Sequence, residues 1–390
     1  MIILKVWEQR KLKSISNKVT LKNKEHQDFP VLTNSAQDGI VNQETFFDRK
    51  IANNTNDYYI VKPDDFVYNP RISKLAPYGP IRRNKLEITG VMSPLYYVFS
   101  LKSNTNKDYL SYYFISSTWY KFMIENGNTG ARSDRFAIKD SIFQRMPIML
   151  PIQNEQTKIG KLFNIIDKDI SLQQRKLDLL KQLKKGLLQK MFADKAQVQP
   201  SLRFKPFSGN WCQNKMGDFI KEFSQKSQIE DEYPTLSSTN KGMENRNGRV
   251  DGKSNIGYKI IENGDLVLSP QNLWLGNINI NKIGVGIVSP SYKTFKFKNG
   301  INPDFIKPQL RTKRMLFNYE NASTQGASVV RRNLDLKSFL EIKIYKPFDI
   351  KEENDISLIF NLLESLVAYH KSKLQYFTKL KKFLLQQMFI

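Results

Sequence analysis

Residues 159–192 read IGKLFNIIDKDISLQQRKLDLLKQLKKGLLQKMF, and residues 356–389 read ISLIFNLLESLVAYHKSKLQYFTKLKKFLLQQMF. The second segment repeats the first 197 positions later, and no gap is needed to align them. The two copies are identical at the positions of Ile159, Phe163, Asn164, Lys176, Leu177, Leu183, Lys184, Lys185, Leu187, Leu188, Gln189, Met191 and Phe192. This many identities at one offset indicate that the chain contains the same structural unit twice.

Both copies have the apolar period of an α-helix, in steps that alternate between three and four residues. We predict that the seam of these helices consists of Ile166, Ile170, Leu177, Leu180 and Leu187 in the first, and Leu363, Val367, Leu374, Phe377 and Leu384 in the second. Gln173 and His370 share one position of the seam, and Lys184 and Lys381 share another, which is typical of long, partly hydrated helices. Neither copy contains proline, and each helix would be roughly 50 Å long. The matching seams predict an antiparallel coiled coil with pseudo-two-fold symmetry.

The remainder of the chain repeats as well, which predicts two tandem domains. Trp7 corresponds to Trp211, and further matching blocks follow at offsets between 196 and 200. These blocks match Tyr58, Asp65, Val67 and Pro70 with Tyr258, Asp265, Val267 and Pro270, and Gly90, Ser93, Pro94, Tyr96 and Phe99 with Gly286, Ser289, Pro290, Tyr292 and Phe295. We expect an α+β protein with mixed domains at 1–151 and 210–347, long helices at 152–192 and 348–390, and a linker at 193–209.

Within each domain, short apolar runs bounded by Pro, Gly and Asn predict strands. In the first domain these runs are YYIV, DFVY, LYYVF and MPIML. The aromatic-rich segment 107–127 predicts one helix that is capped by Gly127. Its counterpart at 302–323 contains Pro308, which weakens the helical prediction. Pro151 and Pro347 are expected to end the last strand before each long helix.

The composition points to a polyanionic partner. The chain has 390 residues, a formal net charge of +24 and a pI of about 9.7, with 40% hydrophobic and 12% aromatic residues. A folded, strongly basic protein most often binds nucleic acid, although a generic solubility charge is the alternative. The lone Cys212 excludes an internal disulfide and a zinc site built on several thiolates. No signal peptide or membrane helix is expected, so we predict a cytoplasmic protein.

Four loops combine basic, aromatic and glycine residues, two in each half: 68–84, 126–136, 269–280 and 323–333. Arginine can pair with guanine, and Asn or Gln with adenine, while glycine lets the backbone approach phosphate. We predict DNA contacts from Arg71, Lys74, Tyr78, Arg82, Arg83, Arg132 and Arg135 in the first half, and from Gln271, Asn272, Trp274, Gln325, Arg331 and Arg332 in the second. The alternative is that these loops are ordinary solvated turns.

Catalytic motifs are incomplete. The segment 68–71 reads Tyr-Asn-Pro-Arg, whereas an amino-methyltransferase needs a second proline in place of Arg71. A nuclease-like set can be assembled from Pro303, Asp304, Glu341 and Lys343, but the pattern is short. No phosphate-binding GxxxxGK[ST] loop occurs. We expect neither catalytic residues nor metal ligands in the chain.

Taken together, these features resemble the specificity subunit of type I restriction-modification systems. The resemblance lies in two tandem variable domains that open on WEQRKL and WCQNKM, and in two repeated helices that end in LLQKMF and LLQQMF. It covers essentially the whole chain, although the lead into Trp211, LRFKPFSGN, has no equivalent before Trp7.

The resemblance implies that each half is a target recognition domain for one part of a bipartite, asymmetric site on double-stranded DNA. It also implies a scaffold on which two modification (methyltransferase) subunits dock and which restriction (translocase and nuclease) subunits join. The cofactors S-adenosylmethionine, ATP and magnesium are then expected in those partners and not in this chain. Two other hypotheses stay open: a self-sufficient DNA methyltransferase or nuclease with degenerate motifs, and a coiled-coil adaptor whose basic charge is incidental.

Overall fold

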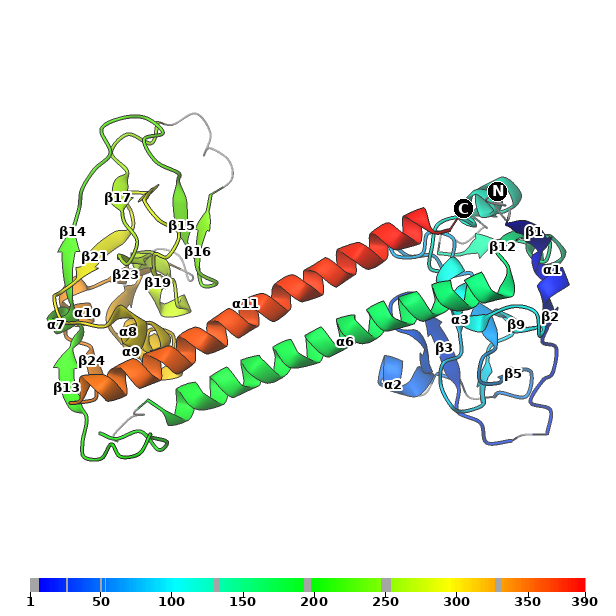
Figure 1. The fold of residues 1–390 in the computed structure, drawn as a ribbon, viewed down its shortest axis with the longest axis horizontal. Coiled ribbons are helices and arrows are strands. Elements are labelled where there is room, and N and C mark those ends of the chain that lie inside the picture. The colour runs from blue at the N-terminus through cyan, green and yellow to red at the C-terminus, as the bar shows by residue number, and fades with distance from the viewer. Residues whose placement is uncertain are drawn as a thin grey trace. The chain divides into compact units, whose positions relative to one another are not determined.

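The computed structural model describes residues 7–389 except 26, 50, 53, 130–133, 193–197, 247–253 and 327–330. The chain forms two compact units: unit 1 comprises Met1–Gln174 and Ser372–Ile390, and unit 2 comprises Arg175–Lys371. Each unit therefore contains one globular part and a portion of both long helices (Figure 1). None of the helices in the described part of the chain is both long and apolar enough to cross a membrane.

Unit 1 contains twelve short strands and five short helices. The strands are β1 (Glu8–Lys11), β2 (Ser16–Lys18), β3 (Leu32–Ser35), β4 (Gly39–Asn42), β5 (Tyr59–Val61), β6 (Phe66–Tyr68), β7 (Ile81–Arg83), β8 (Gly90–Met92), β9 (Tyr97–Leu101), β10 (Asn128–Thr129), β11 (Phe136–Ala137) and β12 (Pro147–Leu150). The helices are α1 (Leu12–Ile15), α2 (Gln43–Phe47), α3 (Lys107–Tyr113), α4 (Tyr120–Asn126) and α5 (Asp140–Phe143). These counts refer to the described residues.

Unit 2 repeats this order of strands within the described residues, but it has no counterpart of α2 and has an additional 3-10 helix between its sixth and seventh strands. Its strands are β13 (Cys212–Lys215), β14 (Ile220–Phe223), β15 (Leu236–Ser238), β16 (Met243–Asn245), β17 (Lys259–Ile261), β18 (Leu266–Leu268), β19 (Ile278–Ile280), β20 (Gly286–Val288), β21 (Lys293–Phe297), β22 (Ser323–Gln325), β23 (Arg332–Leu334) and β24 (Lys343–Lys346). Its helices are α7 (Met216–Phe219), α8 (Pro303–Gln309), α9 (Lys313–Asn321), α10 (Leu336–Leu340) and the 3-10 helix η1 (Pro270–Leu275).

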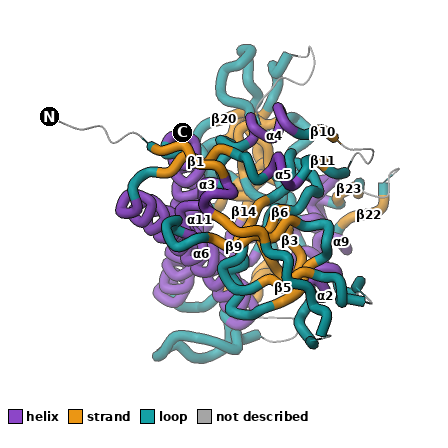
Figure 2. Tube along the Cα trace, turned by 90° about the vertical axis from the view of Figure 1, so that its right-hand side faces the viewer, coloured by secondary structure: helices purple, strands orange, loops and turns teal. Residues whose placement is uncertain are grey.

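The sheets of the two units have the same topology. A four-stranded antiparallel sheet has the order β2-β9-β6-β7 in unit 1 and β14-β21-β18-β19 in unit 2. In unit 1, β9 and β6 lie side by side at the centre of this sheet (Figure 2). The two-stranded pairs β1-β12, β3-β4, β5-β8 and β10-β11 correspond to β13-β24, β15-β16, β17-β20 and β22-β23. The predicted mixed α and β domains are thus confirmed.

The central strand of each sheet is apolar throughout because both of its faces are covered. Phe66 and Tyr68 belong to the larger core of unit 1, whereas Val67 points to a second, smaller core with Leu32 and Val98. Side chains alternate between the faces of a strand, so this sheet separates two hydrophobic clusters. In unit 2 the strand Leu266–Leu268 divides its two clusters in the same way.

One glycine in each unit allows close packing across this smaller core. A Cβ at Gly90 would lie 2.5 Å from the Leu32 side chain and 2.7 Å from the carbonyl oxygen of Pro30. A Cβ at Gly286 would lie 2.5 Å from the side chain of Leu236. These separations are below any tolerated contact, so only glycine fits at either strand.

The predicted single helix at 107–127 is wrong in its continuity, because α3 ends at Tyr113 and α4 begins at Tyr120. Ser116 lies in the gap, where its hydroxyl donates to the Tyr113 carbonyl and accepts from the Thr118 N–H. Such local bonds compete with the helical ladder. Gly127 does follow α4, and a Cβ there would lie 2.3 Å from the ring of Phe136.

The two long helices are α6 (Gln153–Lys190) and α11 (Ile350–Gln387), each of 38 residues. Within each unit they run side by side (Figure 1). In unit 1 the Asp167 carboxylate of α6 lies 2.5 Å from the Lys381 ammonium of α11. In unit 2 Lys184 of α6 lies 2.8 Å from Glu364 of α11. Later positions on α6 meet earlier positions on α11, so the helices are antiparallel, as predicted.

The segment after α6 packs on unit 2 where it is described. The Arg203 guanidinium donates to both carboxylate oxygens of Glu352, at 2.6 and 2.8 Å, and Glu352 is fully buried on α11. Bidentate pairing of this kind compensates the desolvation of a buried carboxylate. Trp211 follows and packs edge-on against Phe192 at the end of the long repeat. This segment is therefore anchored to unit 2, although most of its described residues are exposed.

Candidate nucleic-acid interface

The two basic loops of unit 1 meet in the structure. The Ile72 N–H donates to the Asp134 carbonyl at 3.0 Å, and the Phe136 N–H donates to the Pro70 carbonyl at 2.8 Å. Between them, Arg71 and Arg135 form an isolated antiparallel bridge. These backbone bonds hold the segments that follow β6 and precede α5 against each other. The structure thus brings together two loops that lie more than 50 residues apart in the sequence.

The predicted contact residues of these loops differ in their exposure. Arg71 and Lys74 are exposed, and Arg135 is half-buried. The Arg71 guanidinium lies 3.7 Å from the Asp134 carboxylate, but its side chain keeps 61% of its exposure. Tyr78 is half-buried and packs edge-on against Tyr120 and Phe136. Arg132 lies outside the described residues.

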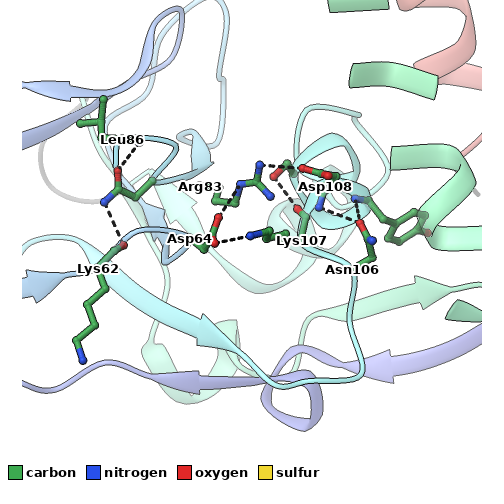
Figure 3. A network of polar contacts seen from close by, with 10 residues as sticks. Lys62, Asp64, Arg83, Leu86, Asn106, Lys107 and Asp108 are labelled. Carbon is green, nitrogen blue, oxygen red and sulfur yellow. Dashed lines mark hydrogen bonds and ion pairs between the residues drawn. The ribbon is translucent and has the colours of Figure 1, made fainter. Parts of the chain in front are cut away.

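Arg82 and Arg83 turn toward unit 1 itself. The Arg82 guanidinium donates to the carbonyls of Ala36 at 2.8 Å and Ile81 at 3.1 Å, and burial lowers its pKa. Arg83 is 9% exposed and lies 2.8 Å from Asp108 and 3.7 Å from Asp64 (Figure 3). These partners give both arginines a role in holding β7 in place. Their contact with DNA stays a prediction.

The two loops of unit 2 also meet. The 3-10 helix η1 packs against β23, and Gly276 ends η1 with a φ of 83° while its N–H donates to the Leu273 carbonyl at 2.8 Å. Glycine adopts this left-handed conformation without steric cost, which explains why Gly276 directly follows η1. The loop arrangement of unit 1 is therefore repeated, with a short helix in place of the extended segment.

Half of the predicted residues of unit 2 are exposed. Gln271, Gln325 and Arg331 are exposed, while Asn272 and Trp274 are half-buried. The Arg332 guanidinium donates to the Ser323 hydroxyl at 2.9 Å and to the Ser323 and Glu320 carbonyls at 3.2 and 3.3 Å. Arg332 thus ties β23 to the end of α9.

The turns that carry these loops are fixed by the same side chains in both units. Asp65 accepts from the Lys62 N–H at 2.8 Å, and Asp265 accepts from the Glu262 N–H at 2.7 Å. Burial raises the pKa of Asp65 to about 6 and also raises that of Asp265. The following turn is held by an asparagine amide in each unit. Asn84 donates to the Lys62 carbonyl at 3.0 Å, and Asn281 donates to the Glu262 carbonyl at 2.8 Å. Asp65 and Asp265 are matched in the repeat, but their role in the turns depends on backbone contacts that the sequence pattern does not show.

The helix pair contains a duplicated ion pair. Asp167 and Lys381 in unit 1 occupy the positions that Glu364 and Lys184 occupy in unit 2, 197 residues apart in each case. Glu364 also binds Lys307 of α8, and although burial alone would raise its pKa, the two lysines together lower it. Lys184 and Lys381, which share one predicted seam position, therefore form equivalent ion pairs between the two long helices, one in each unit. All ten predicted apolar seam residues are buried or half-buried.

Each long helix has a second apolar stripe that faces away from the seam. Ile165, Leu172 and Leu179 on α6 follow one another at intervals of seven residues. Their equivalents on α11 are Leu362, Tyr369 and Tyr376, followed by Phe383. All seven side chains are between 45% and 61% exposed. Exposed apolar residues at regular spacing on a helix are typical of a protein interface.

The residues on which the alternative enzyme hypotheses depend form hydrogen bonds and ion pairs within the fold. Asn69 donates from its amide to the Asn34 carbonyl at 2.9 Å and accepts from the Arg71 N–H, so it shapes a buried turn. Asp304 pairs with Lys282 at 3.1 Å, and Glu341 pairs with Lys215 at 2.7 Å. Among the described residues, no group of three or more His, Cys, Asp or Glu is placed to hold a metal ion.

Known proteins resemble this chain in its first half by sequence and over its whole length by fold. Residues 5–182 match the type I restriction modification DNA specificity domain family. The crystal structure of the S subunit of a type I restriction-modification system from M. genitalium is similar with a TM-score of 0.60 at 13% identity, covering 100% of this chain and 98% of that one.

A second solved structure comes from work on complex assembly and conformational transition of the type I R-M system. It is similar with a TM-score of 0.51 at 11% identity, covering 97% of this chain and 96% of that one. None of the curated proteins is significantly similar in sequence. Residues 5–182 therefore match the type I restriction modification DNA specificity domain family, and the internal repeat and the common fold extend this likeness to the rest of the chain.

Proposed function

We propose that each unit reads one part of a bipartite, asymmetric site on double-stranded DNA. One observation supports this most strongly: the two units have the same topology, but their paired loops carry different side chains. Exposed Arg71 and Lys74 and half-buried Arg135 occupy the loops of unit 1, whereas exposed Gln271, Gln325 and Arg331 occupy those of unit 2. Two domains with the same topology but different loop residues are suited to binding two half-sites of different sequence.

In this proposal the residues have two kinds of role. Exposed arginines and lysines bind phosphates or guanine, and exposed glutamines pair with adenine. Arg82, Arg83 and Arg332 act as positioning residues, since their guanidinium groups already bind acceptors within their own units. Helices of 38 residues are about 57 Å long, which is enough to separate two reading surfaces by one DNA turn of about 34 to 36 Å.

We further propose that the exposed stripes on α6 and α11 bind two modification (methyltransferase) subunits. The stripe is duplicated by the 197-residue repeat, so the chain offers two equivalent apolar surfaces. Restriction subunits then join the complex, S-adenosylmethionine, ATP and magnesium are bound by these partners, and the assembly works in the cytoplasm on chromosomal DNA.

Methylation mapping tests the proposed function. Genomes of cells with and without this chain are compared for methylated bases, with the modification subunit present in both. We expect modification at a two-part asymmetric motif only in cells that contain the chain. If the motif is modified equally in its absence, the chain does not provide the specificity. If the purified chain alone methylates or cuts DNA when given S-adenosylmethionine or magnesium, the enzyme hypothesis holds instead.

A further inference from the structure

The loop 68–84 of unit 1 contains a tight turn that holds an exposed leucine. Ser73 and Ala76 exchange two backbone hydrogen bonds, at 3.0 and 3.1 Å, so Lys74 and Leu75 are the two central residues of the turn. Ala76 is only 3% exposed, whereas Leu75 is 65% exposed. The turn therefore presents an apolar side chain to the solvent beside a lysine.

Contacts at the base of the loop hold this turn in place. The Tyr68 hydroxyl donates to the Tyr78 carbonyl at 3.0 Å, which ties the end of β6 to the residues after the turn. Gly79 has a φ of 82°, and a Cβ there would lie 2.1 Å from the Asn69 carbonyl oxygen, so the two sides of the loop approach as closely as glycine allows. The backbone on both sides of Leu75 is thus fixed by its own unit.

The corresponding loop of unit 2 presents a leucine at the same position on a different backbone. The strands β6 and β18 are related by an offset of 200 residues, and at this offset Leu75 corresponds to Leu275. Leu275 is the last residue of η1 and is 44% exposed. Leu273 of the same 3-10 helix is buried in the core of unit 2 and anchors η1 there. An extended turn in one unit and a short helix in the other thus both carry an exposed leucine.

This recurrence is more informative than the exposure of either leucine. Single exposed leucines are common on protein surfaces and indicate no function by themselves. Between residues 69–76 and 269–276, however, only Pro70 and Leu75 meet an identical residue at the offset of 200. The residues predicted to read DNA differ in the same stretch, where Arg71 corresponds to Gln271. An exposed leucine that both loops share indicates a contact that is common to both half-sites.

The thymine methyl group is the part of DNA that suits an exposed leucine. An A·T base pair presents the C5-methyl group of thymine in the major groove and not in the minor groove. The proposed function already assigns guanine to exposed arginines such as Arg71 and adenine to exposed glutamines such as Gln271, and both pairings use atoms of the major groove. A leucine on the same loop would remove apolar surface from water by packing on the methyl group, whereas a phosphate offers it no apolar surface.

We propose that Leu75 and Leu275 each pack against the C5-methyl group of a thymine, one in each half-site. This inference rests on the proposed function and adds to it one contact of the same chemistry in both units. It requires that each half-site contain at least one A·T base pair. The polar residues around the leucines, which differ between the units, then distinguish the two half-sites.

Replacing thymine by deoxyuridine tests the contact, because it removes the methyl group and leaves the base pairing unchanged. Duplexes that carry the motif found by methylation mapping are prepared with one thymine at a time replaced by deoxyuridine. Their affinity is measured for the complex of the chain with its modification subunits, with the chain as wild type, Leu75→Ala or Leu275→Ala. The matched control is Leu21→Ala, which shortens a leucine of unit 1 that is 57% exposed and lies outside the loops.

For the wild type we expect one position in each half-site at which loss of the methyl group weakens binding about four-fold, the effect of one buried methyl group. Leu75→Ala should no longer distinguish thymine from deoxyuridine at the position in the half-site of unit 1, while the other position keeps its effect. Leu275→Ala should show the reverse. Leu21→Ala should behave like the wild type at both positions.

Several results would overturn the inference and leave the proposed function intact. These are a wild type that is indifferent to every methyl group, equal discrimination by the wild type and both leucine variants, and a half-site without an A·T base pair. A rise in 2-aminopurine fluorescence that depends on Leu75 would also overturn it, because the leucine would then be inserted between stacked bases. If the wild-type complex does not prefer the mapped motif to unrelated DNA, the proposed function fails and the inference fails with it.

Discussion

The C-terminal end of α11 should be essential for the stability of unit 1. Phe389 is 5% exposed and lies beside Tyr109, Tyr113 and Phe163, with ring centroids 5.4, 6.0 and 5.8 Å apart. Its equivalent, Phe192, occupies the same kind of aromatic cluster in unit 2. The second copy of the repeat thus ends inside the core of the first unit.

We predict that Phe389→Ala destabilises unit 1 by about 3 to 5 kcal/mol, the range observed for buried Phe→Ala substitutions. For a unit of this size, that corresponds to a fall in Tm of roughly 6 to 20 °C. The matched control is Phe383→Ala, which makes the same chemical change in the last turns of α11, before Phe389, at a side chain that is 57% exposed. The control should change stability by less than about 1 kcal/mol.

Urea unfolding and calorimetry measure both variants. Phe389→Ala should lower the midpoint of the unfolding transition of unit 1. The midpoint of the unfolding transition of unit 2 should not change. If Phe389→Ala melts like the wild type, or if both variants lose equal stability, the end of α11 is not part of the unit 1 core and the described packing of the repeat is wrong.

Three further predictions concern pH, DNA affinity and spacing. The folded-state pKa of Asp65, about 6, lies above its unfolded value near 4. As pH rises from 4 to 6, the wild type should therefore lose about 2 kcal/mol relative to Asp65→Asn, and a constant stability difference in urea melts would refute this. Replacing both Arg71 and Arg135 with Ala should reduce the salt slope of DNA binding by about two units if each contacts a phosphate, and an unchanged slope removes them from the interface. Inserting four helical residues, about 6 Å, after Lys176 should change the gap between half-sites or abolish modification, and altered half-site bases would argue against a helical spacer.

Much of the fold could be predicted because it rests on short-range patterns. The period of the long helices depends on residues three and four positions apart, and the repeat shows in a direct alignment of the chain with itself. The boundaries of α3 and α4 could not be predicted in this way. They depend on Ser116 bonding to nearby backbone in preference to continuing the helix.

The candidate interface was only partly predictable for a different reason. Sequence identifies arginine-rich loops, but the direction of each guanidinium depends on acceptors that are distant along the chain. Arg82 binds the carbonyl of Ala36, 46 residues away, and Arg83 binds Asp108. Likewise, the heptad pattern predicts one apolar seam but does not show that a second apolar stripe, with Ile165 and Leu172, stays exposed. That exposure depends on how the helices pack.

A domain exchange with methylation mapping tests the central claim most directly. Residues 1–151 are replaced by the same region of a relative with a different specificity, and modified bases are mapped across the genome. The account predicts that one half of the recognised site changes, while the other half and the gap between them stay as they were, since each unit carries its own core and its own loops. A change in both half-sites together would contradict the claim that the two units read DNA separately.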